Sequence, residues 1–197
     1  MMTAALWAAV LLSVSYAAMF GQRNVYLIGP MGSGKTAVGR RLATLLGKQF
    51  FDSDAEIEKR TGVDVRYIFE KEGEARFRER EREVIAALTA LDDVVVATGG
   101  GVILDPTNRE RLANTGTVIY LETNLDTLVR RTKAAKTRPL LMNDDPRSVL
   151  ERLMVVRRPL YEEAADLRVE TTGRQVRAVA IDIEQRLAQR VAKPVST

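Results

Sequence analysis

The stretch that decides the fold is residues 24–46, which read NVYLIGPMGSGKTAVGRRLATLL. Its first five residues, NVYLI, form a mainly apolar run typical of a buried strand, and its amphipathic end predicts a helix over 35–46 that stops at Gly47. Between them, residues 29–36 match the phosphate-loop pattern G-x-x-x-x-G-K-[ST]. A strand before the loop and a helix after it are the context that this motif requires, so we interpret it as a nucleotide-phosphate site.

The residues of this loop suit a nucleotide. Its glycines let backbone N–H groups turn inward around phosphate oxygens, and the helix N-terminus adds its positive dipole end. We expect Lys35 to reach the β- and γ-phosphates and the Thr36 hydroxyl to ligate Mg²⁺. The positions of the loop expected to bind the nucleotide are Gly29, Met31, Gly32, Ser33, Gly34, Lys35 and Thr36.

The composition limits the chemistry that can accompany the loop. The 197 residues suit one domain, and 46% are hydrophobic and 28% charged, as in ordinary soluble proteins. The absence of cysteine and histidine excludes thiolate and histidine catalysis and metals bound by either residue. The net charge of +4, from 30 basic and 26 acidic residues, gives no reason to expect a nucleic-acid partner.

Strands and helices alternate along the chain from residue 23. This pattern predicts an α/β fold of three layers, with a five-stranded parallel sheet between helices. The expected strands are residues 24–28, 50–52, 94–97, 117–121 and 167–171. The expected helices after the first are one that carries Ile57 and others over 65–71, 74–91, 107–114, 125–132, 147–164 (broken at Pro159) and from 174 onward. Residues 133–146 are basic and contain prolines, which indicates a mobile lid.

The N-terminal 21 residues carry no charge and are rich in Ala and Leu. About 20 such residues can span a bilayer, and Arg23 would then place the rest of the chain in the cytoplasm. A disordered tail, or a reading frame extended upstream of Met19, explains the segment equally simply. We therefore divide the chain into a leader (1–21), a kinase-like domain (22–192) and a tail (193–197), and we expect the domain to be cytoplasmic.

Two groups of candidate residues follow the second and third expected strands. Asp52, Ser53 and Asp54 end one strand, and Gly99, Gly100 and Gly101 follow the other. Ligands of open α/β sheets bind beyond the carboxyl ends of the strands. One aspartate could therefore approach Mg²⁺ and the other accept a proton, while the glycines admit a ligand to the backbone. The same residues are compatible with a helix N-cap at Ser53 or Asp54 and with an ordinary turn.

Several arginines are further candidates. Glu81 belongs to an otherwise apolar helical stripe with Phe77, Val84, Leu88 and Leu91, and Arg78 lies one turn from it. Arg78 could grip a substrate carboxylate, or the two could form a surface pair. Arg157 is a second possible clamp. Arg138, in the expected lid, could neutralise charge on a transferring phosphoryl group or be an ordinary loop charge.

Together these residues resemble the shikimate kinase family over about residues 23–187. The P-loop alone is shared by GTPases, motors and small-molecule kinases, but the chain is short for a motor and contains no N-K-x-D motif. The resemblance lies in an ordered set: LIGPMGSGKT (27–36), DSD (52–54), GE with FR (73–78), GGG (99–101), RPLL (138–141) and R-x-PLY (157–161). It implies ATP-dependent phosphorylation of the 3-hydroxyl of shikimate, a step toward chorismate and aromatic amino acids.

The resemblance also implies roles for single residues. It makes Asp54 the base and acceptor-hydroxyl ligand, Asp52 the carboxylate near Mg²⁺, and Glu81 the support of Arg78. It assigns the substrate to Arg78, Arg157 and residues 99–101, and it assigns ATP to Arg131, Arg138 and Arg174 as well as to the P-loop. We expect Lys35, Asp54 and Arg138 to be catalytic, and the chain to act as a monomer. The alternatives are another small-metabolite kinase, for gluconate or a nucleotide, and a non-catalytic ATP-binding module tethered to a membrane.

Overall fold

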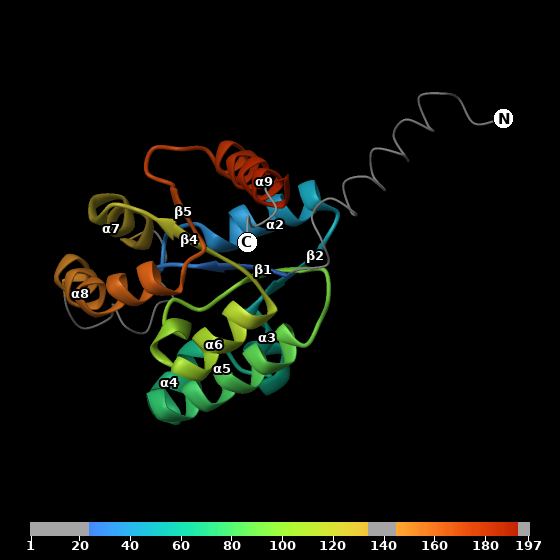
Figure 1. The fold of residues 1–197 in the computed structure, drawn as a ribbon. Helices are drawn as coiled ribbons and strands as arrows, with labels where there is room; N and C mark the ends of the chain where they lie inside the picture. Colours follow the sequence, from blue (N-terminus) through green and yellow to red (C-terminus); the bar gives the residue numbers. More distant parts are fainter. Residues whose placement is uncertain (1–23, 134–144, 193–197) are drawn as a thin grey trace.

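Five parallel strands form one sheet in the order β2-β3-β1-β4-β5 (Figure 1). The computed structural model describes residues 24–133 and 145–192. The strands are β1 (Asn24–Ile28), β2 (Gln49–Asp52), β3 (Val94–Ala97), β4 (Gly116–Glu122) and β5 (Leu167–Glu170). The helices are α2 (Lys35–Leu46), α3 (Ser53–Thr61), α4 (Val65–Lys71), α5 (Gly73–Thr89), α6 (Pro106–Thr115), α7 (Leu125–Lys133), α8 (Pro146–Ala164) and α9 (Val176–Ala192), with a 3₁₀ turn over Val102–Leu104. The α/β fold class expected from the sequence is therefore confirmed.

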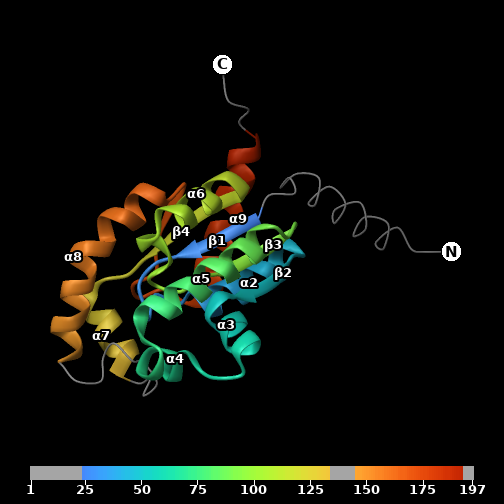
Figure 2. The ribbon, with the colours of Figure 1, turned by 90° about the horizontal axis from the view of Figure 1, so that it is seen from below.

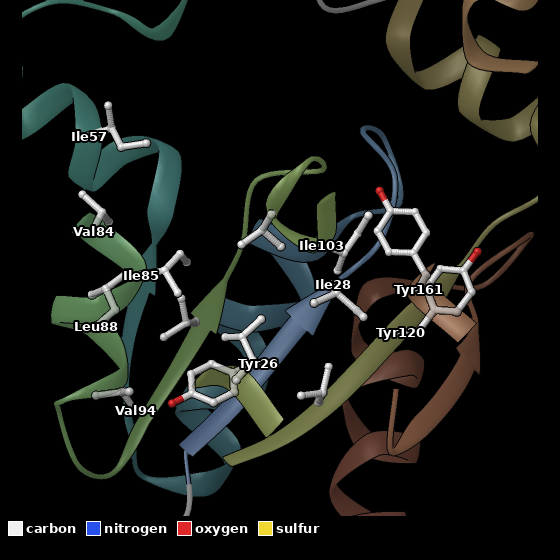
Figure 3. Close-up of a cluster of buried hydrophobic side chains, with 14 of the residues drawn as sticks. Tyr26, Ile28, Ile57, Val84, Ile85, Leu88, Val94, Ile103, Tyr120 and Tyr161 are labelled. Carbon is white, nitrogen blue, oxygen red and sulfur yellow. The ribbon is translucent and has the colours of Figure 1, made fainter. Parts of the chain in front are cut away.

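Alternate residues of the strands supply the two halves of the core, because side chains of a strand point to opposite faces. Val25 and Leu27 of β1 pack with α2 and α9 on one face of the sheet. Tyr26 and Ile28 pack on the other face with residues of α3, α5 and α8, including Tyr161 (Figure 3). Covering both faces buries all five residues of β1, which explains why the four residues after Asn24 are apolar without interruption.

The order of the strands places the P-loop at the centre of one sheet edge. From β1 the chain first builds β2 and β3 on one side, and it then crosses to build β4 and β5 on the other. The loop after β1 thus lies where the connections diverge, which is where open α/β sheets bind ligands. Helices α7 and α8 lie side by side on the β4 and β5 side of the sheet (Figures 1 and 2).

Three local expectations are wrong. The N-cap of α3 is Asp52, whose Oδ1 accepts from the N–H groups of Asp54 and Ala55, not Ser53 or Asp54. Helix α8 continues through Pro159. Proline has no N–H to donate to the carbonyl of Val155, but Val155 is 77% exposed, so water can replace this hydrogen bond. Helix α5 ends at Thr89, so Leu91 leaves the apolar stripe and is exposed.

The leader (1–21), most of the expected lid and the tail (193–197) lie outside the described residues. Arg138 lies there too. Within residues 24–133 and 145–192, no helix has the length and apolar character that crossing a membrane requires.

Candidate active site

The P-loop has a backbone that only glycine adopts readily. Gly29, Gly32 and Gly34 have φ values of 140°, 81° and 96°. A Cβ on Gly29 would also lie 2.8 Å from the Leu121 carbonyl oxygen, so a side chain is excluded by contact as well as by conformation. The sequence pattern G-x-x-x-x-G-K-[ST] is thus the pattern of a strained turn that presents N–H groups at the start of α2.

The Lys35 ammonium and the Thr36 hydroxyl lie at the start of α2 with different partners. Lys35 Nζ donates to the carbonyls of Gly29 (2.7 Å) and Pro30 (2.8 Å). Thr36 Oγ1 donates to Asp52 Oδ2 at 2.7 Å. The pairing of Thr36 with Asp52 brings a hydroxyl and a carboxylate from two elements together beside the P-loop, and oxygen ligands of this kind are those that Mg²⁺ prefers.

A cavity of about 470 Å³ adjoins the P-loop at the same edge of the sheet. It is lined by Met31, Asp54, Glu58, Asp64, Val65, Arg66, Phe69, Phe77, Arg78, Glu81, Gly99, Gly100, Gly101 and Arg157. The volume suits a small metabolite. Every residue that the sequence assigned to the acceptor lines this one cavity, and Met31 connects it to the P-loop.

Arg78 and Glu81 form the most deeply buried ion pair of this cavity. Arg78 Nη1 lies 2.7 Å from Glu81 Oε2, and the exposed fractions of the two side chains are 18% and 1%. Burial raises the pKa of the Glu81 carboxyl, although Arg78 and Arg157 act in the opposite direction. Burial acts to lower the pKa of Arg78, but Glu81 and Glu74 outweigh it and raise that pKa. The guanidinium is therefore a permanent cation held by two carboxylates, rather than an exposed surface charge.

The residues 99–101 bring the backbone close to these charges. A Cβ on Gly99 would lie 2.7 Å from both Asp54 Oδ1 and Glu81 Oε1. A Cβ on Gly101 would collide with the Arg78 guanidinium. The Gly99 N–H donates to the buried Ser53 Oγ at 2.8 Å, which ties this turn to the start of α3. Glycine at these positions thus leaves room for charged side chains to converge on one point.

The remaining candidate arginines are placed differently. Arg157, 6% exposed on α8, lines the cavity. Arg131 Nη1 donates to the Gly32 carbonyl at 3.0 Å, so it lies against the P-loop. Arg174 Nη1 donates to Asp182 (2.8 Å) and to the Glu170 carbonyl (3.0 Å) at the end of β5.

The structure adds residues that the sequence did not single out for the cavity. Phe69 of α4 packs on Phe77 with ring centroids 4.5 Å apart, and both rings line the cavity. Glu58 lines it one helical turn after Asp54, and its Oε1 accepts from the Val65 N–H at 3.0 Å. The spacing of Glu58 from Asp54 on one helix face was the signal available for finding it.

The fold, the P-loop and the cavity beside it together define a small-molecule kinase of the P-loop class. The sequence model described as shikimate kinase matches residues 31–188. The shikimate kinase of Pseudoalteromonas atlantica is 50% identical over 171 residues, which are 87% of this chain and 100% of that protein. The shikimate kinase of Halorhodospira halophila is 53% identical over 83% of this chain and 93% of its own length. This chain belongs to the shikimate kinase family.

A solved structure agrees with this assignment. Shikimate kinase from Acinetobacter baumannii, determined in complex with shikimate, superposes with a TM-score of 0.87 at 46% identity. The match covers 90% of this chain and 99% of that one. The family predicted from the ordered motifs is confirmed, and so is an enzyme of the kinase class.

Proposed function

We propose that this chain transfers the γ-phosphoryl group of ATP to the 3-hydroxyl of shikimate. Shikimate carries one carboxylate and three hydroxyls. The cavity beside the P-loop offers arginines for the carboxylate, an aspartate for the hydroxyls and a glycine backbone that permits close approach. The single observation that carries the proposal is that these three kinds of group line one 470 Å³ cavity next to the P-loop.

On the nucleotide side, the N–H groups of the P-loop and the N-terminus of α2 receive the phosphates. Lys35 exchanges the carbonyls of Gly29 and Pro30 for β- and γ-phosphate oxygens, since its ammonium is already directed across the loop. Arg131 lies against the Gly32 carbonyl of the P-loop, and we assign it to the adenosine part of ATP. We assign Arg138 and Arg174 to the nucleotide as well, with Arg138 stabilising charge on the transferring group.

The pair Thr36 and Asp52 fits a magnesium site, because the two oxygens lie 2.7 Å apart at the P-loop. Within the described ranges no three acidic side chains gather closely enough to hold a metal alone. The residues present therefore suit an ion that is held mainly by phosphate and water, with Thr36 as ligand and Asp52 beyond it. Mg²⁺ bound there supplies neutralisation of phosphate charge.

On the acceptor side, Arg78 and Arg157, which both line the cavity, bind the carboxylate. Glu81 holds Arg78 by the 2.7 Å ion pair. Asp54, at the first turn of α3, receives the proton of the attacking hydroxyl. The turn 99–101 fixes the ring of the substrate against these groups. Phosphoryl transfer depends mainly on positioning and electrostatics, which a chain without cysteine and histidine can supply.

The acceptor specificity is tested by ADP release with three acceptors: shikimate, gluconate and a nucleoside monophosphate. We expect turnover with shikimate alone. Gluconate is the demanding comparison, because it also has a carboxylate and hydroxyls. Turnover of gluconate or the nucleotide without turnover of shikimate would contradict the proposal and favour another metabolite kinase.

The role of the base is tested with Asp54→Asn, which keeps the size of the side chain. We expect kcat to fall by at least about 10²-fold while ATP still binds. Asp64→Asn is the matched control, since Asp64 lines the same cavity but caps α4 by accepting from the Tyr67 N–H at 2.6 Å. Asparagine caps helices as well as aspartate, so the control should keep its kcat. Equal rates for the two variants would remove Asp54 as the base.

A further inference from the structure

Tyr161 is a buried tyrosine that the proposed chemistry has not used. It is fully buried on α8, one helical turn after Arg157. Its ring stacks on Tyr120 with centroids 5.1 Å apart (Figure 3). Its hydroxyl donates to the carbonyl oxygen of Gly100, a residue of the acceptor turn 61 positions earlier in the chain. A side chain of α8 is thus fastened to the turn that lines the acceptor cavity.

Arg157, on the same helix, also lies close to Gly100. A Cβ on Gly100 would lie 3.7 Å from Arg157 Nη1, so the guanidinium and the Tyr161 hydroxyl meet the same residue of the turn. The Arg157 charge also acts on the phenol, because it lowers the pKa that burial raises. A hydroxyl has one proton and two lone pairs. Giving the proton to Gly100 leaves the lone pairs for the guanidinium, which fixes the direction from which Arg157 can approach.

The Tyr161 hydroxyl keeps its proton at neutral pH and can therefore donate to Gly100. Burial raises the pKa of Tyr161, and the influence of Arg157 in the opposite direction is smaller. The group therefore remains a neutral donor, and it supplies direction without adding a charge that would compete for Arg157.

We propose that Tyr161 is a positioning residue for acceptor binding, which holds Arg157 and the Gly100 backbone in the geometry that receives a carboxylate. The inference rests on the proposed function, in which Arg157 binds the carboxylate of shikimate. Tyr161 is not among the residues that line the acceptor cavity; it acts on the acceptor through Arg157, against which its bond to Gly100 holds the turn. Its loss should therefore weaken acceptor binding and leave nucleotide binding unchanged.

The test is Tyr161→Phe, compared with Tyr120→Phe. The two rings stack, but the Tyr120 hydroxyl is buried without a hydrogen-bond partner among the described residues, so its removal takes away no bond. We expect Tyr161→Phe to raise KM for shikimate by about tenfold, as expected for one lost buried hydrogen bond. KM for ATP should stay within about twofold, and Tyr120→Phe should leave both constants within that range. Equal constants for wild type and Tyr161→Phe, or a rise in both KM values, would overturn the proposal.

A double-mutant cycle with Arg157→Ala separates this inference from the proposed function. In the Arg157→Ala background, Tyr161→Phe should change KM for shikimate by less than about twofold, because the residue it acts through is gone. A further full tenfold loss would show that Tyr161 acts independently of Arg157 and would overturn the proposal. If Arg157→Ala raises KM for shikimate and Tyr161→Phe does not, the positioning role of Tyr161 is wrong and the proposed function stands. If Arg157→Ala leaves KM for shikimate unchanged, the proposed binding of the carboxylate by Arg157 is itself wrong.

Two further measurements distinguish positioning from general stability. Replacing Tyr161 by 4-aminophenylalanine keeps an N–H donor at the same place and should restore KM for shikimate, whereas a persistent loss would argue against a donor role. Wild-type protein labelled with ¹³C at the tyrosine Cζ needs no substitution at 161 and so works even if Tyr161→Phe does not fold. One tyrosine signal should shift when shikimate is added, and the same shift should be seen in Tyr120→Phe. A spectrum that shikimate leaves unchanged would overturn the proposal.

Discussion

Adding one methyl group at residue 99 tests how closely the acceptor-site carboxylates must be placed. In Gly99→Ala the new Cβ would lie 2.7 Å from Asp54 Oδ1 and 2.7 Å from Glu81 Oε1. Ordinary contact begins near 3.4 Å, so the two oxygens must withdraw by about 0.7 Å each. Glu81 is 1% exposed and bonded to Arg78 at 2.7 Å, so it cannot turn into solvent. The strain therefore moves Asp54, Arg78 or both.

The expected loss follows from this displacement. A misplacement of about 1 Å in a reacting group costs about 10²-fold in rate, so we expect kcat for shikimate to fall on the order of 30- to 100-fold. The overpacked site should also lower the free energy of unfolding by about 1–3 kcal/mol. Binding of ATP should be unaffected, because the altered contact lies in the acceptor cavity.

Steady-state ADP release with shikimate and ATP measures these constants, and urea melts measure the stability. Gly100→Ala is the matched comparison, since its Cβ would lie 3.4 Å from the nearest atom, the Met31 backbone nitrogen. We expect its loss in kcat to be at least about tenfold smaller. Equal rates for wild type and a folded Gly99→Ala would show that the carboxylates can shift without consequence for the reaction, contrary to this prediction.

Three other predictions address the cations, the buried acid and the leader. Arg78→Ala or Arg157→Ala should weaken shikimate binding by about 2–5 kcal/mol in calorimetric titrations, since a buried charge loses its partner; an unchanged Kd would mean that the clamp is misassigned. Burial raises the folded-state pKa of Glu81 above 4.5, so the folded state binds this proton more tightly and the contribution of Glu81 to stability falls as pH rises from 4.5. In urea melts at increasing pH, Glu81→Gln should therefore gain stability relative to wild type, and a difference that does not change with pH would contradict this expectation. A chain beginning at Met19 should keep kcat and both KM values, since every assigned residue lies at 29 or beyond, and fractionation of the tagged full-length chain should recover the enzyme without membranes.

The parts of the fold that the sequence predicts well are those fixed by local chemistry. The P-loop needs glycine at positions of positive φ, so its spacing is visible in the sequence. The apolar runs of β1, β3 and β4 are unbroken because both faces of the sheet are covered. Asp54 and Gly99 were predicted at one sheet edge because each follows a strand, whereas Arg78 and Arg157 lie on helices and were joined to them only through the ordered motifs.

The expectations that failed depended on tertiary context. Ser53 and Asp54 both suit an N-cap by residue type. Ser53, however, is buried and accepts from the Gly99 N–H, and the extended backbone of Asp52 directs its carboxylate to the first N–H groups of α3. Proline usually breaks a helix, but Pro159 does not, because the carbonyl left without its donor belongs to the exposed Val155. The link from Tyr161 to Gly100 joins residues 61 positions apart, and no sequence period indicates it.

Product analysis by NMR shows directly whether this chain phosphorylates shikimate at its 3-hydroxyl. The enzyme is incubated with ATP, Mg²⁺ and shikimate, and coupling between phosphorus and the ring protons identifies the ester position. We predict a single product with phosphorus coupled to the proton on C3. Phosphorus coupled to another ring proton, or unreacted shikimate under conditions in which gluconate is phosphorylated, would contradict the account.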